Sequence, residues 1–567
     1  MERLIRNEEA QRLDAITKAT LGIDDLILME KASIRLWDAL KTVMQRLVKA
    51  KKGLLSIEDL HIVAICGKGN NGGDTLAVLR HAWSFGFHNI DAFVSKGPLS
   101  PACTKQRDIV LQTGVRIHDW GDRQKPLPQH TGITGMLECG KAAQSADIIL
   151  DGVLGSGIKG EPREEAASMI VNINELRKLA QRPAIISIDL PSGLWGGYKK
   201  GDLCVHADIT LALSPTKIEY FIPDAREACG SIVRINDVFP KDLIEKTLIE
   251  ADAPLVRLVR LEASDLAKLN PSTSRSAYKI SRGRLAILAG SKGRLGAAIE
   301  CARAALVSGA GYVTLFVEDD LYNVTATALP SVIVRPEGDF FSEASKSGLV
   351  PYDTILAGPG WGLSQGRKAQ LESILRTKVP LVLDADALRL IYGMEKLACE
   401  RKYPLVLTPH PGEYKALCGE DGQTGAFDTF WTGVSRVASR YNAQVVYKSH
   451  VTWITSPNGR IAVWDGRNPA LGTAGSGDVL SGLLAGLLAA YEAKHHENRD
   501  SNGLTQNDIA FEASCAAVVA HGVAGTNLAR RLGWFAASEL VPECGKILGR
   551  ADNADNADSA DNRRRNG

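Results

Sequence analysis

The sequence lacks a CxxC pair, a strong net charge and a long apolar run, and each absence excludes a class of protein. Ten cysteines are scattered without ligand spacing, which argues against a zinc site and favours reduced thiols. The formal net charge of +2 is too small to attract nucleic acid or an anionic membrane surface. The longest apolar helical stretch, Val479–Tyr491, falls short of the ~20 residues of a membrane span. We therefore expect neither nucleic-acid nor membrane partners.

The length of the chain indicates more than one domain. Its 567 residues exceed a typical domain of ~100–200 residues. A content of 45% hydrophobic and 23% charged residues is ordinary for a globular protein. The opening segment, MERLIRNEEAQRLDA, carries acidic residues and no apolar h-region, so no signal peptide is expected. Together with the unpaired cysteines, this favours a cytoplasmic protein.

Short apolar strands alternate with helical stretches in both halves of the sequence. Most are β-branched and followed by Gly, Asp or Pro, which is typical of parallel strands covered by helices. We predict an α/β fold with domains at 1–245 and 255–550, a break near 240–275, and a disordered tail at 551–567. The predicted strands are HIVAICG, IDAFVS, ADIILDG, AIISIDL and ADITLAL, then RLAILAG, YVTLFV, TILAGPG, PLVLDAD, PLVLTPH and AQVVYK.

The segment Gly67–Gly72, GKGNNG, fits the G-x-G-x-x-G pattern of a dinucleotide-binding turn, but its surroundings do not. That fingerprint needs an acidic residue at the end of the next strand. Here Asp91 opens that strand, and Ser95 and Lys96 close it. The two asparagines and Asp74 suit a loop that binds sugar hydroxyls, phosphate or a hard cation. A turn that caps the next helix is the alternative.

Two later loops carry polar side chains after predicted strands. Asp151 ends one strand and is followed by the flexible turn Gly155–Gly157, which suits an anion. Asp189 ends another strand and is followed by Pro191–Gly193. Ligands of open α/β sheets bind at the carboxyl ends of strands, so these loops and the GNNGGD segment point to one crevice.

The motifs GNNGGD, D-x-x-x-G-x-G and D-x-PSG, in this order, resemble the NAD(P)H-hydrate epimerase domain of the YjeF N-terminal type. The resemblance covers roughly residues 5–240 and includes QRLDAIT and ILMEKAS. It implies a Rossmann-like doubly wound domain and a potassium ion held by Asn71, Asp151 and Ser192. It also implies an acid–base role for Asp189 and substrate contacts from Asn70, Asn71, Gly72, Gly73, Asp74, Gly155, Ser156, Gly157 and Asp189.

The segment LGTAGSGDVLSGLLAGLL is the sharpest signal in the second half. The turn Ala474–Gly477 directly precedes a predicted helix, where successive N–H groups and the helix dipole make an anion site. Asp478 lies at the entrance of that helix, beside the predicted phosphate site. A carboxylate there can accept the proton of a hydroxyl that attacks phosphorus. The alternative is that Asp478 is only a charge at the helix N-terminus.

Together with TPHPGE and GPGWG, this segment resembles the ADP-dependent NAD(P)H-hydrate dehydratase, which has a ribokinase-like fold. The resemblance covers about 260–550 and includes Asp384–Leu388 and Gly533–Leu540. It implies ADP as co-substrate, with Mg²⁺. The implied substrate contacts are Ala297, Gly360, Gly362, His410 and Asp478, and the implied ADP contacts are Lys448, Ser449, His450, Val451, Thr452, Gly475, Ser476 and Gly477.

Three positions depart from the dehydratase pattern. Tyr278 stands where a His precedes the Lys, and the following Gly is displaced to Gly283. Arg294 replaces an aromatic residue in a Gly-rich loop, and Ser331 replaces the Glu of a Pro-Glu pair. These positions lie at loop edges, so we expect them to affect substrate affinity more than the reaction.

The two resemblances predict one bifunctional enzyme. The first half would interconvert the R and S epimers of hydrated NADH or NADPH, and the second would dehydrate the S epimer with ADP, giving AMP and phosphate. The family's usual assembly implies a homo-oligomer. The alternatives are a ribokinase-like small-molecule kinase, which leaves the first half unexplained, and a nucleotide-sensing scaffold, which leaves Asp189 and Asp478 unexplained.

Overall fold

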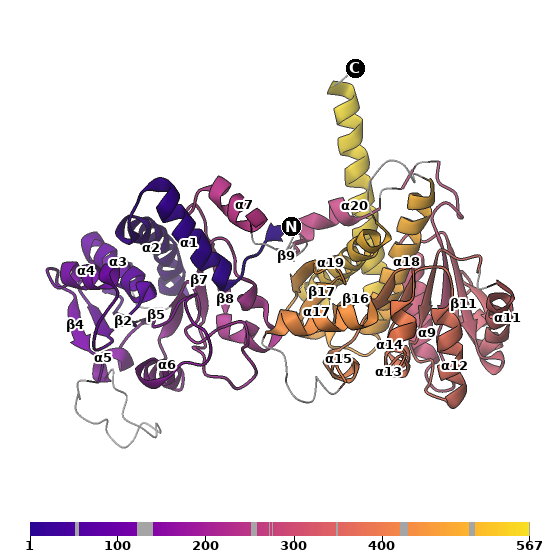
Figure 1. Cartoon of the computed structure of the whole chain (residues 1–567), viewed down its shortest axis with the longest axis horizontal. Coiled ribbons are helices and arrows are strands. Elements are labelled where there is room, and N and C mark those ends of the chain that lie inside the picture. Colours follow the sequence, from indigo (N-terminus) through magenta and orange to yellow (C-terminus); the bar gives the residue numbers. More distant parts are fainter. Residues whose placement is uncertain are drawn as a thin grey trace. The chain divides into compact units, whose positions relative to one another are not determined.

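The computed structural model describes residues 1–50, 56–121, 140–250, 258–271, 273–274, 276–347, 350–419, 429–497 and 505–565. The chain forms two compact units, Arg3–Pro254 and Leu255–Gly567, and the second includes Met1–Glu2 (Figure 1). Both are α/β units, so the predicted fold class and the two-domain organisation are confirmed. Within the predicted break at 240–275, residues 251–257, 272 and 275 lie outside the described residues.

The N-terminal unit is built on a seven-stranded parallel sheet in the order β4-β3-β2-β5-β6-β7-β8. Strands β2, β3 and β4 follow one another from the middle of the sheet to one edge. Strand β5 then lies on the other side of β2. The switch point between β2 and β5 is where such sheets bind ligands. The strands are β2 (Ile62–Cys66), β3 (Ile90–Val94), β4 (Arg116–Asp119), β5 (Ile148–Gly152), β6 (Ala184–Ile188), β7 (Ile209–Leu213) and β8 (Ser231–Ile235).

Helices cover both faces of this sheet. Alternate residues of β2 show this, because Ile62 and Ala64 pack with α2 and α3, whereas Val63 and Ile65 pack with α6. Burial on both faces explains why the strands are apolar throughout. The helices are α1 (Asn7–Leu21), α2 (Asp25–Ala50), α3 (Asn70–Phe85), α4 (Pro101–Val110), α5 (Gly140–Gln144), α6 (Glu164–Leu176) and α7 (Lys241–Glu250), with 3₁₀ turns η1 (Ile57–Asp59), η2 (Ile218–Phe221) and η3 (Pro223–Cys229).

The C-terminal unit contains an eleven-stranded sheet in the order β1-β9-β18-β17-β16-β15-β14-β13-β10-β11-β12. The strands from β12 to β16 pair in parallel, but β17 is antiparallel to β16 and to β18. The six strands predicted in this half, β10, β11 and β13 to β16, are parallel as expected, and the antiparallel strands β17 and β18 were not predicted. The strands are β1 (Glu2–Arg3), β9 (Leu258–Arg260), β10 (Arg284–Leu288), β11 (Tyr312–Val317), β12 (Ile333–Pro336), β13 (Thr354–Ala357), β14 (Leu381–Leu383), β15 (Leu405–Leu407), β16 (Gln444–Tyr447), β17 (Val451–Thr455) and β18 (Ile461–Asp465).

The core of this unit is centred on α18, which packs against α9 and α19. A Cβ on Gly482 would lie 2.3 Å from the Cys301 carbonyl oxygen, so glycine is what lets α18 approach α9 closely. The helices are α8 (Leu266–Leu269), α9 (Leu295–Val307), α10 (Tyr322–Ala328), α11 (Glu337–Ser347), α12 (Gln365–Leu375), α13 (Asp386–Leu390), α14 (Glu395–Cys399), α15 (Pro411–Leu417), α17 (Phe430–Tyr441), α18 (Ser476–Glu497), α19 (Gln506–Leu532) and α20 (Ala537–Arg565), with 3₁₀ turns η4 (Ala263–Asp265), η5 (Asp319–Leu321) and η6 (Pro469–Leu471).

Two long helices differ from the sequence-based expectation. By length and composition alone, α19 could cross a membrane, with a mean hydropathy of 1.3, but 83% of that window is buried inside the unit, as expected of a core helix. The apolar stretch from Val479 is therefore not the strongest candidate in the chain. Helix α20 continues to Arg565 through part of the predicted disordered tail, because extending an existing helix costs far less than starting one.

Candidate active sites

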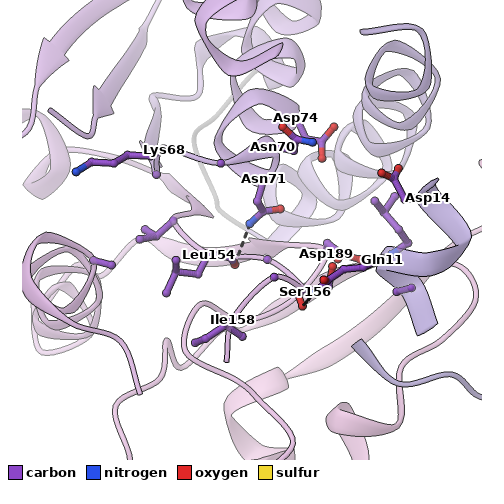
Figure 2. A pocket seen from close by; sticks show the side chains of 18 of the residues that line it. Gln11, Asp14, Lys68, Asn70, Asn71, Asp74, Leu154, Ser156, Ile158 and Asp189 are labelled. Carbon is purple, nitrogen blue, oxygen red and sulfur yellow. Dashed lines mark hydrogen bonds between the residues drawn. The ribbon is translucent and has the colours of Figure 1, made fainter. Parts of the chain in front are cut away.

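The N-terminal unit has a cavity of about 610 Å³ at the carboxyl ends of β2, β5 and β6. Its walls come from α1, from the start of α3, and from the loops that follow β5 and β6 (Figure 2). The cavity brings together seven of the nine predicted substrate contacts, which are Asn70, Asn71, Asp74, Gly155, Ser156, Gly157 and Asp189. The three polar loops that the sequence places at strand ends thus meet in one crevice.

The other two predicted contacts, Gly72 and Gly73, lie outside the cavity lining and are packing positions. A Cβ on Gly72 would lie 2.2 Å from the carbonyl oxygen of Gly67. A Cβ on Gly73 would lie 2.6 Å from the terminal methyl of Met29. These two glycines therefore let the first turn of α3 sit directly against the end of β2 and against α2.

Asp189 is held in a strained and tightly bonded position. Its backbone φ is +64°, which is uncommon for a residue other than glycine and is frequent at functional sites. Its carboxylate accepts hydrogen bonds from Lys217 Nζ at 2.7 Å and from the Leu213 backbone N–H at 3.2 Å. The Lys217 side chain is only 4% exposed, so this ion pair is shielded from solvent.

Two further carboxylates face the same cavity as Asp189. Asp74 lies on the first turns of α3, and Asp14 comes from α1 (Figure 2). Burial raises the pKa of Asp74 well above its usual range, and the charges of Asp189 and Asp14 raise it further. The site therefore combines a carboxylate paired with lysine and a carboxyl group that tends to keep its proton.

The predicted cation ligands converge beneath the cavity. Ser192 Oγ lies 2.5 Å from Asp151 Oδ1 and 3.1 Å from the Leu154 carbonyl oxygen. The Asn71 amide donates to the same carbonyl at 3.0 Å. Asp151 is fully buried, and burial raises its pKa, although hydrogen bonds from Ser192 oppose this. A buried carboxylate among oxygen donors, with no cationic side chain bonded to it in the described part of the chain, fits a hard monovalent cation.

Three residues of this site were missed from the sequence. Gln11 and Asp14 lie on one face of α1, and the Gln11 amide donates to the Ser156 carbonyl at 2.5 Å. Lys217 follows β7 in a segment without glycine. The spacing of Gln11 and Asp14 on a helix was the one available signal, because a three-residue interval puts both on the same face.

In the C-terminal unit, Asp478 lies in the first turn of α18, directly after Gly475–Gly477. Burial raises its pKa to about 7, and the charges of Asp384, Glu300 and Glu413 add to this effect, while Lys448 opposes it. Lys448 Nζ itself bonds to Asp384 Oδ1 at 2.6 Å. The predicted catalytic carboxylate thus stands among acidic groups beside one lysine.

The segment Asp384–Asp386 links this cluster to the predicted substrate contacts. The Asp386 carboxylate accepts from the Gly362 N–H at 2.8 Å and from Arg294 at 3.0 Å. A Cβ on Gly360 would lie 3.2 Å from the Ala297 methyl, so these two residues also meet here. The departure Arg294 therefore has a defined partner beside the site.

His410 faces solvent and holds the start of α15. Its ring accepts from the Gly412 and Glu413 backbone N–H groups, and its side chain is 57% exposed. His410 is bonded to Glu413, and the charge of Glu413 acts on Asp478. This exposure leaves the ring free to contact a substrate.

The predicted ADP contacts divide into two groups. Gly475 and Gly477 flank the start of α18, and a Cβ on Gly477 would lie 3.5 Å from Lys448 Nζ. The other group lies in the turn between β16 and β17, where the hydrogen bonds from Ser449 and Thr452 stay within the turn. This group also contains Lys448 and His450, which connect the two strands together with Ser449, and Val451, which begins β17.

Ser476 has a partner that the sequence did not indicate. Its hydroxyl lies 3.1 Å from Nε2 of His521 on α19, inside the protein. Burial lowers the pKa of His521 to about 4, so the ring is neutral at physiological pH. This neutral ring fixes the turn without adding charge to the predicted phosphate site.

The departures Tyr278 and Ser331 are exposed and stand apart from these contacts.

The fold and the two sites define the class of this protein. It is a two-domain α/β enzyme with one cavity at a topological switch point and one glycine-rich turn beside a carboxyl group whose pKa is about 7. Residues 25–218 match the family model for the YjeF-related protein N-terminus, and residues 285–544 match the model for NAD(P)H-hydrate dehydratase.

Similar proteins identify the family. The chain is 31% identical over 502 residues to the bifunctional NAD(P)H-hydrate repair enzyme of Gloeobacter violaceus, covering 86% of this chain and 89% of that protein. It is 30% identical to the enzyme of the same name from Salinibacter ruber, covering 76% and 80% of the two chains. A solved Bacillus subtilis ADP/ATP-dependent NAD(P)H-hydrate dehydratase is 23% identical, with a TM-score of 0.42, over 52% of this chain and 98% of that chain.

The chain belongs to the family of bifunctional NAD(P)H-hydrate repair enzymes. The predicted pairing of an epimerase domain with a dehydratase domain is therefore confirmed at the level of the family.

Proposed function

We propose that the N-terminal unit interconverts the R and S epimers of NAD(P)H hydrate, and that the C-terminal unit dehydrates the S epimer with ADP. Hydration of the nicotinamide ring places a hydroxyl on C6, and only one configuration can fit a shaped dehydratase site. An epimerase makes the other configuration usable. The two activities in one chain thus repair both epimers of the damaged cofactor.

In the dehydratase unit, Asp478 is the proposed general base. It takes the proton of the C6 hydroxyl as that oxygen attacks the β-phosphorus of ADP, and the bond from that phosphorus to the bridging oxygen breaks, releasing AMP. The ring nitrogen lone pair then expels the phosphate, and the C5 proton passes to solvent water, which restores the double bond. The N–H groups at Gly475–Gly477 are placed to hold the phosphate oxygens.

The observation that carries this assignment is the environment of Asp478. A pKa of about 7 lets the group alternate between base and acid near neutral pH. A carboxylate that served only as a helix cap would gain nothing from burial among Asp384, Glu300 and Glu413. Lys448, 2.6 Å from Asp384, is the proposed cationic contact for the transferred phosphate.

In the epimerase unit, Asp74 and Asp189 are the proposed acid and base. Asp74, whose pKa is raised by burial, protonates the departing C6 hydroxyl, which leaves as water while the ring nitrogen lone pair forms an iminium. Water then adds to C6 from the other face and gives its proton to Asp189. Lys217 holds the Asp189 carboxylate in place during both steps.

Asn71, Asp151 and Ser192 are the proposed potassium ligands. A bound potassium ion would supply positive charge beside the Gly155–Gly157 turn and so favour the diphosphate of the substrate. Without a cation, the buried Asp151 carboxylate depends on hydroxyl and backbone donors alone.

The proposal also includes a phosphate donor, a cellular compartment and an oligomeric state. ADP, with Mg²⁺, is the proposed phosphate donor. The nine cysteines among the described residues are free, and all but Cys399 are buried, which suits a reducing compartment such as the cytoplasm. A homo-oligomer remains a prediction from the family resemblance.

The test is a pair of assays on the full chain. Hydrated NADH plus ADP should yield NADH, AMP and phosphate in equal amounts, and pure R hydrate should convert to the S form without ADP. A small-molecule kinase would give a stable phosphorylated product and no NADH. A scaffold would give neither reaction, so either result would overturn the proposal.

A further inference from the structure

A second cavity lies in the C-terminal unit, at the opposite ends of the strands from Asp478. Its volume is about 360 Å³, within the range of small-molecule sites. It is lined by residues that directly precede β13, β14 and β15, among them Asp353, Pro380 and Tyr403. The later part of α18 and the start of α19 close its other side. The proposed reactions leave this cavity without a role.

The cavity contains a buried carboxyl group that lacks a partner. Glu492 on α18 is 1% exposed, and neither carboxylate oxygen has a hydrogen-bond partner within the described part of the protein. Burial raises the pKa of Glu492 to about 7, and the charge of Asp353 adds to it. Gln506, which also lines the cavity, opposes this shift. A buried polar group of this kind is costly unless something bonds to it.

Two cations stand at the exposed side of the same cavity. Lys378 and Lys402 both line it and both are exposed. Within the described residues, neither has an ion-pair partner. The cavity therefore has a carboxyl group in its interior and two free ammonium groups near its opening. Pro380 and the ring of Tyr403 supply apolar and aromatic surface between them.

This arrangement selects a ligand with two unlike ends. The carboxyl group of Glu492 can accept a hydrogen bond from the amino group of adenine, and in its protonated form it can also donate one to a ring nitrogen. Exposed ammonium groups suit phosphate. An aromatic ring and a proline provide a surface on which a base can stack.

We propose that this cavity is a second ligand site that binds an adenosine monophosphate, with the base at Glu492 and the phosphate at Lys378 and Lys402. The site is separate from the dehydratase centre, although α18 carries a residue of each. Asp478 and Glu492 are 14 positions apart in the chain, which is about 21 Å along a helix. The occupant is therefore not the molecule that reacts at Asp478.

The test measures AMP binding to the full chain by calorimetry. Glu492→Met removes the hydrogen-bonding edge while keeping the volume and an apolar contact, so folding is retained. Lys378→Ala with Lys402→Ala removes the phosphate contacts. The matched control is Lys368→Ala with Lys396→Ala, two exposed lysines outside the cavity. We expect both cavity variants to weaken one AMP site at least tenfold and the control to leave it unchanged.

Two further measurements distinguish binding at this cavity from binding at the dehydratase centre. The KM for ADP and the turnover of S hydrate should be unchanged in Glu492→Met, because the dehydratase centre is intact. Ribose 5-phosphate, which lacks the base, should bind the wild-type cavity at least tenfold more weakly than AMP. Equal AMP affinity and stoichiometry in wild type and Glu492→Met would overturn the proposal, and so would equal binding of AMP and ribose 5-phosphate.

Discussion

Replacing Asp478 by Asn tests the central chemical claim, because Asn keeps the size and helix-capping ability of Asp but cannot accept a proton. A positioned general base contributes about 10²–10⁴-fold, or roughly 3–5 kcal/mol of activation free energy. We expect the turnover of S hydrate to fall by that factor. ADP affinity should be retained, because the Gly475–Gly477 backbone and its helix are unchanged. Reduced-nicotinamide absorbance measures turnover, and calorimetry measures ADP affinity.

The pH profile sharpens this test. With a pKa of about 7, the basic form of Asp478 rises from about 9% at pH 6 to about 91% at pH 8, so wild-type turnover should increase about tenfold. The profile of Asp478→Asn should be flat over that range. Asp320→Asn, a change at an exposed aspartate in η5, is the control and should behave as wild type. Near-normal turnover in Asp478→Asn would refute the assignment.

Three other changes are predicted to act on the N-terminal unit. Asp189→Ala should abolish epimer interconversion and leave S-hydrate dehydration intact, as followed by chiral chromatography; epimerisation at the wild-type rate would contradict its role. Exchanging potassium for tetramethylammonium should weaken hydrate binding in wild type but not in Ser192→Ala, and calorimetry showing equal affinity in both ions would exclude the cation site. Gly72→Ala should destabilise the unit by about 2 kcal/mol or more, because its Cβ would lie 2.2 Å from a backbone oxygen. Gly157→Ala, with nothing within 4 Å of its Cβ, should leave the melting temperature nearly unchanged.

The buried strands could be predicted from the sequence, whereas the edges of the sheets could not. Strands such as β2 and β5 are apolar on both faces, and all their residues are buried. The missed strands β4 and β12 lie at sheet edges and are partly exposed, so their polar residues hide the strand pattern. The antiparallel pair β17 and β18 was missed although Asn458-Gly459 in the loop between them is a hairpin signal, and residues 448–450 connect β16 to β17 without glycine.

The residues of the candidate sites also fall into those that could be predicted from the sequence and those that could not. Asp189 and Asp478 could be found because each follows a strand or a glycine-rich turn and belongs to a short motif. Lys217 and His521 could not, because each acts through a partner that is distant in the sequence. Asp189 and Lys217 are 28 positions apart in the chain, and no local motif links them. Such pairs are set by the packing of the sheet and not by local sequence.

The two proposed sites share one arrangement that raises the pKa of an aspartate. In each, one aspartate is bonded to a lysine, at 2.7 Å for Asp189 and at 2.6 Å for Asp384. In each, a second aspartate stands nearby without such a partner, and burial raises its pKa, with the charge of the first as the largest electrostatic contribution. The lysine therefore keeps one carboxylate fixed while the other, Asp74 or Asp478, becomes the group that can exchange a proton. Because the two units have different sheet topologies, a shared fold does not explain this common arrangement, and we infer that the proposed proton transfers at the C6 hydroxyl do.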